Sequence, residues 1–125
     1  MPSALGGFLR ADTVPRLRCT AIVGPANNQL ADDTIADLLA ERGILWAPDF
    51  IVNAGGVTFA VAVSLDGATP AAALARVEAI ADRLDLVLTR ARESGRSTLS
   101  VAVETARRRI DAADAGLVGA ETSGA

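Results

Sequence analysis

Two short polar stretches interrupt apolar sequence and carry side chains that could bind a ligand. Asn27 and Asn28 lie in GPANNQL, residues 24–30, and Asn53 lies in FIVNAGGV, residues 50–57. An asparagine side chain offers both donors and an acceptor, and the two glycines after Asn53 would let a ligand approach the backbone closely. Asparagine and glycine are also ordinary turn residues, so ligand binding and simple turn formation both stay open as interpretations.

The composition removes several other kinds of chemistry. All 12 basic residues are arginine, and the 125 residues include no lysine, histidine or tyrosine. A Schiff base, a serine–histidine pair and a histidine-ligated metal are therefore excluded. No carboxylate pair stands out in the predicted helices, so we predict no catalytic residue and no metal ligand. The formal net charge of −3 argues against sequence-independent binding of nucleic acid.

Half of the residues are hydrophobic and 22% are charged, which is typical of a folded domain rather than a disordered chain. The N-terminus lacks the basic leader and apolar core of a signal peptide, and the uncharged run 50–65 is shorter than the roughly 20 residues of a transmembrane helix. Cys19 is the single cysteine and lies beside the apolar run TAIV, so we expect a buried structural thiol. The sequence thus predicts a cytoplasmic protein that does not enter a membrane.

Short apolar runs alternate with a helical pattern in the first half of the chain. Residues 18–24 and 44–48 are predicted strands. Between them, Asp32 and Asp33 open a predicted helix that Gly43 ends. This order is typical of a parallel α/β sheet, in which ligands bind beyond the carboxyl ends of the strands. Because each asparagine loop follows a predicted strand, we expect both loops at one edge of the sheet.

One long helix dominates the second half. Thr69 and Pro70 are a typical N-cap and first-turn pair, and Gly95 marks the C-terminal end of the helix that they open. Apolar residues at helical spacing predict its buried face. The predicted face consists of Leu74, Val77, Ala81, Leu84, Leu88 and Ala91.

The other segments of the second half are predicted more coarsely. Residues 49–56 are expected to be a loop or irregular segment, followed by a helix over 57–65. A last helix is predicted from about Ser97 to Ile110. Residues 113–125 have no periodicity and are expected to be a mobile tail.

The segments PSALGGFLRADTVPRLRCTAIVGPANNQLADD and LLAERGILWAPDFIVNAGGV resemble the C-terminal part of the Glu/Leu/Phe/Val dehydrogenases, above all the leucine, valine and phenylalanine dehydrogenase branch. The similarity runs from about Ser3 to Ile110, and the motifs ANNQL and APDFIVNAGGV are specific. It implies NAD-dependent oxidative deamination of an apolar L-amino acid to its 2-oxo acid. It also implies a partial Rossmann-type, NAD-binding α/β domain with a C-terminal helical pair, over residues 1–112.

The resemblance assigns roles to individual positions. Asn27 and Asn53 correspond to positions beside the nicotinamide of the cofactor, and Asn28 corresponds to a position that contacts the substrate. Val57 and Ala60, three apart on one helix face, correspond to the apolar wall of the substrate side-chain pocket. A further cofactor-binding segment corresponds to Ser3, Ala4 and Leu5.

The chain also departs from the family pattern. It corresponds to roughly the last third of such an enzyme, and it has no residue for either family lysine. It contains no G-x-G-x-x-G turn for the pyrophosphate, so we expect NAD binding by this chain alone to be weak or absent. Pro25 replaces a small residue and removes a backbone donor, and Ala60 stands where a larger aliphatic residue is typical.

Three hypotheses follow from this mixture of match and departure. The chain is a fragment of an amino-acid dehydrogenase and is inactive alone. Alternatively, it is one chain of a split enzyme, whose complementary dehydrogenase chain supplies the lysines. The third hypothesis is a non-catalytic module that binds a nucleotide, an amino acid or another protein. Self-association into a homo-oligomer is compatible with each, since a truncated sheet leaves apolar surface bare.

Overall fold

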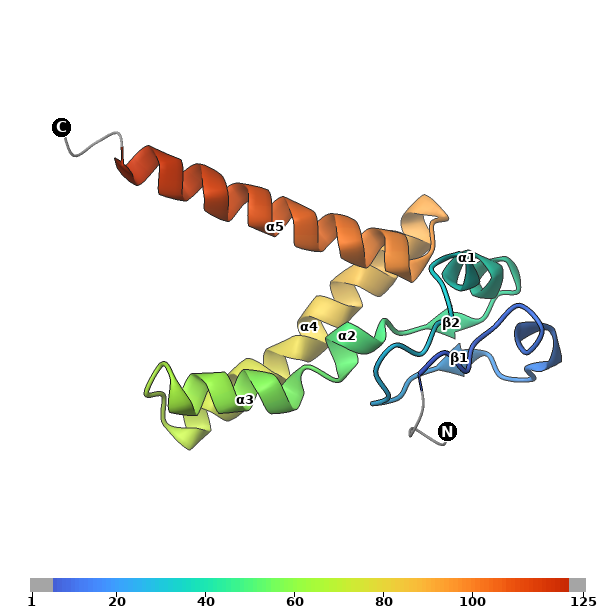
Figure 1. Cartoon of the computed structure of the whole chain (residues 1–125), viewed down its shortest axis with the longest axis horizontal. Helices are drawn as coiled ribbons and strands as arrows, with labels where there is room; N and C mark the ends of the chain where they lie inside the picture. Colours follow the sequence, from blue (N-terminus) through green and yellow to red (C-terminus); the bar gives the residue numbers. More distant parts are fainter. Residues whose placement is uncertain (1–5, 122–125) are drawn as a thin grey trace.

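The computed structural model describes the backbone of residues 6–121 and the side chains of residues 6–114. The first part contains a 3₁₀ turn η1 (Val14–Arg16), strand β1 (Ala21–Ile22), helix α1 (Thr34–Glu41) and strand β2 (Leu45–Trp46). The second part contains four helices, α2 (Asp49–Val52), α3 (Gly55–Ser64), α4 (Pro70–Ser94) and α5 (Thr98–Glu121). Figure 1 shows the two strands and α1 at one end of the molecule, with the long helices extending away from them.

Strands β1 and β2 form a parallel pair in which Ala21 lies opposite Leu45 and Ile22 opposite Trp46. The backbone N–H of Ala47 donates to the carbonyl of Ile22 at 3.0 Å, which fixes this register. The predicted order of two parallel strands around one helix is confirmed. The strands are shorter than predicted, with two residues each in place of 18–24 and 44–48.

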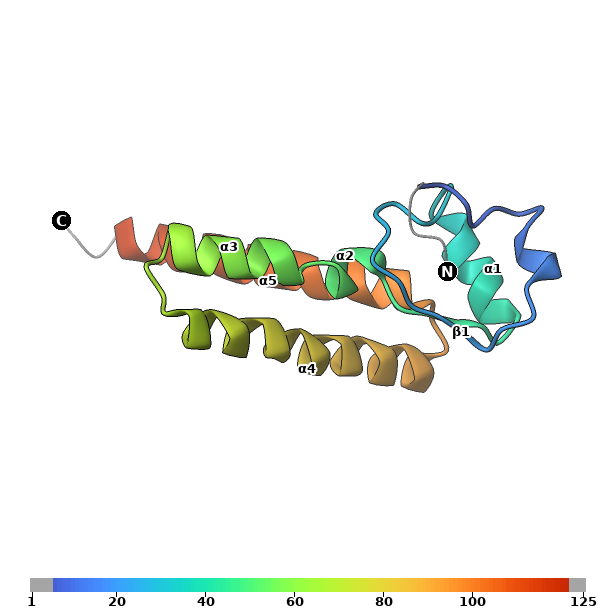
Figure 2. The ribbon, with the colours of Figure 1, turned by 90° about the horizontal axis from the view of Figure 1, so that it is seen from below.

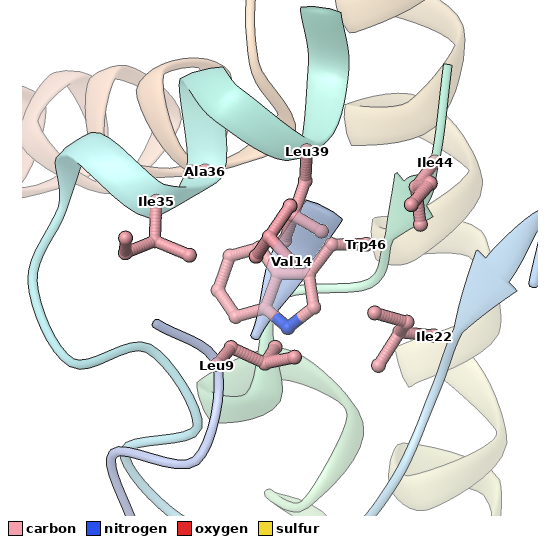
Figure 3. Close-up of a cluster of buried hydrophobic side chains, with 8 residues drawn as sticks. All are labelled: Leu9, Val14, Ile22, Ile35, Ala36, Leu39, Ile44 and Trp46. Carbon is pink, nitrogen blue, oxygen red and sulfur yellow. The ribbon is translucent and has the colours of Figure 1, made fainter. Parts of the chain in front are cut away.

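The main core fills the space between this sheet and α1. Figure 3 shows the indole of Trp46 among Leu9, Val14 and Leu39, with Ile22 and Ile44 beside it. These side chains are almost fully buried. Because a buried aromatic residue carries a large apolar area, Trp46 holds β2 against both α1 and the N-terminal segment.

The predicted limits of α4 are confirmed by local chemistry. The side chain of Thr69 accepts a hydrogen bond from the backbone N–H of Ala72 at 3.3 Å, and Pro70 occupies the first turn. Gly95 follows the helix with φ of +66°, a left-handed conformation that favours glycine.

The predicted apolar face of α4 is wrong at two of its six positions. Leu74 is 54% exposed and Ala81 is exposed, whereas Ala73 and Val87 are buried. Apolar residues occur both on the side of α4 that contains Leu74 and on the side that contains Ala73 and Val87. Packing against α2, α3 and α5 buries the second of these sides. Figure 2 shows α3 lying along the first half of α4.

Residues 49–56, predicted as a loop, instead contain α2 and the start of α3. Pro48 precedes α2 and Asp49 lies in its first turn, where a carboxylate is favourable, so a short helix satisfies the backbone there. The last helix also ends later than predicted, at Glu121 rather than near Ile110, and therefore includes residues 113–121. The rest of the predicted tail, residues 122–125, lies outside the described residues.

Cys19 is exposed, so the expectation of a buried thiol was wrong. The strand begins only at Ala21, and Cys19 precedes it beyond the cover of the core. None of the helices within residues 6–121 combines the length and apolar character that a membrane span requires.

Candidate functional site

The two asparagine loops meet at the carboxyl ends of the parallel strands. Asn27 follows β1, and Asn53 lies between α2 and α3. The side-chain Nδ2 of Asn53 donates a hydrogen bond to Oδ1 of Asn27. The expectation that both loops lie at one edge of the sheet is therefore confirmed. We call Asn27, Asn28 and Asn53 together the asparagine edge.

The loop around Asn28 has an unusual backbone conformation. Asn28 has φ of +53°, in the left-handed region that asparagine tolerates better than most residues. The N-terminal segment packs tightly against this loop, because the N–H of Gly7 donates to the carbonyl of Asn28 at 2.6 Å. A Cβ atom on Gly6 would lie only 3.0 Å from the same carbonyl oxygen. Glycine at position 6 thus permits the close approach of the two segments.

A buried glutamine closes the loop from the inside. Gln29 is 1% exposed, and its Nε2 donates to the carbonyl oxygens of Gly24 at 2.8 Å and Ala26 at 3.1 Å. Its Oε1 accepts a hydrogen bond from Nε1 of Trp46 at 3.1 Å. The side chain of Gln29 therefore ties the loop after β1 to the core residue of β2. A fully satisfied buried network of this kind favours one rigid arrangement.

Asp49 connects the two loops. Its carboxylate accepts a hydrogen bond from the backbone N–H of Gln29 at 2.7 Å, and its backbone carbonyl accepts from the N–H of Asn53 at 2.9 Å. Sequence reasoning identified neither Gln29 nor Asp49 as part of the site. Their positions in the sequence were the only signals that could have indicated them: Gln29 directly follows the two asparagines, and Asp49 directly follows Pro48.

The asparagine edge is an open surface rather than an enclosed pocket. Asn27 and Asn28 are exposed, and Asn53 is half-buried. Val57 is 63% exposed, and Ala60 is exposed on the same helix α3. Ser3, Ala4 and Leu5, the other predicted cofactor-binding residues, lie outside the described residues. An exposed edge of this kind can form one wall of a site but cannot exclude water alone.

Two hollows of the described chain lie away from the asparagine edge. One of about 500 Å³ lies between α1, β2 and α4, and another of about 320 Å³ lies between α2, α4 and α5. Neither is lined by an asparagine. Within residues 6–114, no cluster of three carboxylate, thiol or imidazole groups could hold a metal ion. The chemistry available at the edge is therefore hydrogen bonding by amides.

The amides of the edge retain hydrogen-bonding capacity after they contact each other. The contact uses Nδ2 of Asn53 and Oδ1 of Asn27. Among the hydrogen bonds within residues 6–114, none uses Nδ2 of Asn27 or Oδ1 of Asn53. The Nδ2 donor of Asn27 and the Oδ1 acceptor of Asn53 thus stay available, and a donor with an acceptor is the complement of another primary amide.

Comparison with known proteins places these residues in one family. Residues 1–113 match the family model described as Glutamate/Leucine/Phenylalanine/Valine dehydrogenase, and the chain belongs to this family. The leucine dehydrogenase of Bacillus cereus is 41% identical over 109 residues, which cover 87% of this chain and 30% of the relative. The valine dehydrogenase of Streptomyces coelicolor is 43% identical over 109 residues, with the same coverage of 87% and 30%.

A solved structure supports the same assignment. The crystal structure of L-tryptophan dehydrogenase from Nostoc punctiforme matches with a TM-score of 0.81 at 37% identity. The match covers 89% of this chain and 33% of that chain. The chain therefore spans about a third of the length of an amino-acid dehydrogenase, and the resemblance predicted from ANNQL and APDFIVNAGGV is confirmed.

Proposed function

We propose that these residues form the nicotinamide- and substrate-facing wall of an NAD-dependent amino-acid dehydrogenase. The reaction converts an apolar L-amino acid, water and NAD⁺ to the 2-oxo acid, ammonia, NADH and a proton. Residues 1–112 would be the C-terminal part of its Rossmann-type, dinucleotide-binding domain. The observation that carries the proposal is the contact between Asn27 and Asn53 at the carboxyl ends of β1 and β2. Ligands of parallel α/β sheets bind at that edge.

The cofactor fits the amide chemistry of the edge. Nicotinamide carries a primary carboxamide, and Asn27 and Asn53 together present the donor and acceptor that pair with such a group. We assign Asn27 and Asn53 to the nicotinamide half of NAD and extend the cofactor contacts to Ser3, Ala4 and Leu5. When bound, NAD supplies the acceptor for the hydride that leaves the amino-acid Cα. The role of the asparagines is to orient the acceptor ring.

The substrate would bind beside the ring. We assign Asn28 to the polar part of the amino acid and the exposed apolar positions Val57 and Ala60 to its side chain. Three relatives support an apolar or aromatic substrate, since they are named as leucine, valine and phenylalanine dehydrogenases. The small side chain of Ala60 leaves room for a bulky substrate at this wall.

The 125 residues offer neither a lysine nor a histidine as general base, and the carboxylate of Asp49 beside the asparagine edge is buried and accepts from the N–H of Gln29. Arginine stays protonated at ordinary pH. General acid–base help is typically worth roughly 10²–10⁴-fold in rate. The open edge also lacks the opposite wall that would exclude water from a hydride transfer. We therefore expect the 125-residue chain to be inactive alone and to work together with the lysine-bearing domain of a dehydrogenase.

A chimeric enzyme tests this proposal. In the chimera, this chain replaces the matching segment of the Bacillus cereus leucine dehydrogenase, to which it is 41% identical. NADH formation is followed with L-leucine, L-valine, L-phenylalanine and L-glutamate at alkaline pH. The isolated chain is assayed beside it.

We expect turnover of apolar amino acids by the chimera and none by the isolated chain. A chimera that folds and binds NADH but deaminates no amino acid would contradict the proposal. Turnover that purifies with the isolated chain would contradict the expected need for another domain. It would then favour a self-sufficient enzyme.

A further inference from the structure

The residue that links the two asparagine loops carries a role that the motifs did not predict. We propose that Asp49 is a positioning residue, which sets the separation and orientation of Asn27, Asn28 and Asn53. The inference rests on the proposed function, because it concerns the geometry of the same ligand-binding edge. It assigns Asp49 no contact with substrate or cofactor and no proton transfer.

The two hydrogen bonds of Asp49 reach different loops. Its backbone carbonyl accepts from the N–H of Asn53, four residues later, as the first turn of α2 requires. Its carboxylate reaches a loop 20 residues earlier in the chain and accepts from the N–H of Gln29 at 2.7 Å. One residue thus fixes the start of the Asn53 turn and the residue that follows Asn28.

Because the hydrogen bond between Asp49 and Gln29 is buried, its loss should be costly. Asp49 is 7% exposed, and the N–H of Gln29 would lose its described partner without the carboxylate. A hydrogen bond to an ionised acceptor is roughly twice as strong as one between neutral groups. A buried carboxylate is unfavourable unless hydrogen bonds compensate it, so an apolar residue would suit the packing alone better. The N–H of Gln29 compensates the burial of this carboxylate, in addition to its favourable place in the first turn of α2.

The other hydrogen bonds of the loop after β1 hold it to the sheet, whereas Asp49 joins it to α2. The Gln29 side chain ties the loop to Trp46, and the N-terminal segment holds the Asn28 and Gln29 carbonyls. Those contacts fix the loop to the sheet but not to α2. Within the described residues, the Asp49 carboxylate and the Asn27–Asn53 pair join the loop to the α2–α3 segment. Loss of the carboxylate should therefore release one loop from the other while leaving the loop on the sheet.

The experiment uses the ¹⁵N-labelled 125-residue chain and NMR. Asp49→Ala removes the acceptor, and Asp49→Asn keeps its shape with a weaker neutral acceptor. Asp32→Ala is the matched control, because the carboxylate of Asp32 also accepts a backbone N–H, from Thr34 at 3.0 Å, away from the asparagine edge. Three quantities are measured: exchange of the Gln29 amide, the cross-peak between the Asn27 and Asn53 side chains, and the Trp46 indole resonance.

In Asp49→Ala we expect Gln29 amide exchange to accelerate by roughly tenfold to a hundredfold relative to core amides such as Leu39. The Asn27–Asn53 cross-peak should disappear, while the Trp46 indole resonance keeps its position. Asp49→Asn should give an intermediate change, and Asp32→Ala no change at these groups. An intact Asn27–Asn53 cross-peak in Asp49→Ala would overturn the proposal. If Asp49→Ala unfolds, unchanged Gln29 exchange and an unchanged cross-peak in Asp49→Asn would overturn it instead.

A titration with NADH separates this inference from the proposed function. In the wild-type chain, millimolar NADH should shift the Asn27 and Asn53 side-chain resonances, and Asp49→Ala should weaken that response. Because the chain lacks the G-x-G-x-x-G turn, the same titration is made on the dehydrogenase chimera, and a chimera without any response would count against cofactor binding by the edge. The ligand-free spectra would still decide whether Asp49 positions the asparagines.

Discussion

The part of the molecule before Pro48 and the part after it bury their apolar residues in different ways. The first part has a continuous core of eight buried side chains, with Trp46 among them. The helical part has a smaller cluster, Val87, Ala91, Val101 and Ala102, in which two members are alanine. Among residues 6–114, two large apolar side chains are exposed before Pro48, Val23 and Leu45. Seven are exposed after it: Phe50, Val57, Val61, Leu65, Leu74, Leu86 and Ile110.

This difference indicates which surface is built to meet another one. Helix α3 is apolar on nearly all sides yet packs mainly along α4, so its exposed residues Val57 and Val61 lack a cover within the described chain. Exposed apolar surface of this extent is typical of an interaction face or the wall of a binding site. The asparagine edge lies where the self-contained part joins the uncovered part, as expected for a site that a second domain completes.

Truncation of a leucine to alanine should give the largest difference in stability between the two parts. Leu39 is 0% exposed in the main core, so Leu39→Ala should lower the free energy of unfolding by about 2–5 kcal/mol. Leu74→Ala removes the same atoms from an exposed position on α4 and should change it by less than about 0.5 kcal/mol. Urea unfolding followed by Trp46 fluorescence measures both. Equal losses would contradict the assigned burial of α4.

Substitution of two glycines in the helical part should change the free energy of unfolding by an intermediate amount. Gly95 has φ of +66° after α4, so Gly95→Ala should destabilise by about 1–2 kcal/mol. Gly56 lies in α3, and a Cβ atom added to it would meet nothing within 4 Å, so Gly56→Ala should stabilise by about 0.4–1 kcal/mol. Thermal unfolding by circular dichroism at 222 nm follows the two variants in parallel. Changes of the same sign would show that one of these backbone assignments is wrong.

The smallest expected effect concerns Glu104 on α5. A hydrogen bond from the Arg96 side chain, followed by attraction to Arg108, lowers the pKa of this carboxyl below its ordinary value. Its contribution to stability is therefore present above the unfolded-state pKa and is lost as pH falls through the lower folded-state pKa. NMR titration of the Glu104 side chain should show a higher pKa in Arg96→Gln than in the wild type. A pKa that is the same in both proteins would exclude Arg96 as the main cause.

The sequence predicted those features that depend on local chemistry. Thr69, Pro70 and Gly95 set the ends of α4 through capping and backbone conformation, and these limits are confirmed. The meeting of the two asparagine loops was also predictable, because parallel strands end at the same edge. The family followed from two motifs in the same loops.

Features that depend on distant partners were not predictable in this way. Whether the Leu74 side or the Ala73 side of α4 is buried depends on where α3 packs, because both sides carry apolar residues. Gln29 and Asp49 bind mainly backbone groups, which have no signature in the sequence of their partners. Cys19 was misplaced because its apolar neighbours suggested a longer strand than the one that forms.

The most direct test of the central claim is the kcat/KM for NAD of the dehydrogenase chimera with and without Asn53→Ala. Ser64→Ala, at the exposed far end of α3, serves as the matched control. If the asparagine edge orients the nicotinamide, Asn53→Ala should lower kcat/KM by roughly tenfold to a hundredfold, as expected for the loss of a strong hydrogen bond. Ser64→Ala should leave it unchanged. A folded Asn53→Ala chimera with the kcat/KM of its parent would contradict the claim that this edge is the cofactor-binding wall.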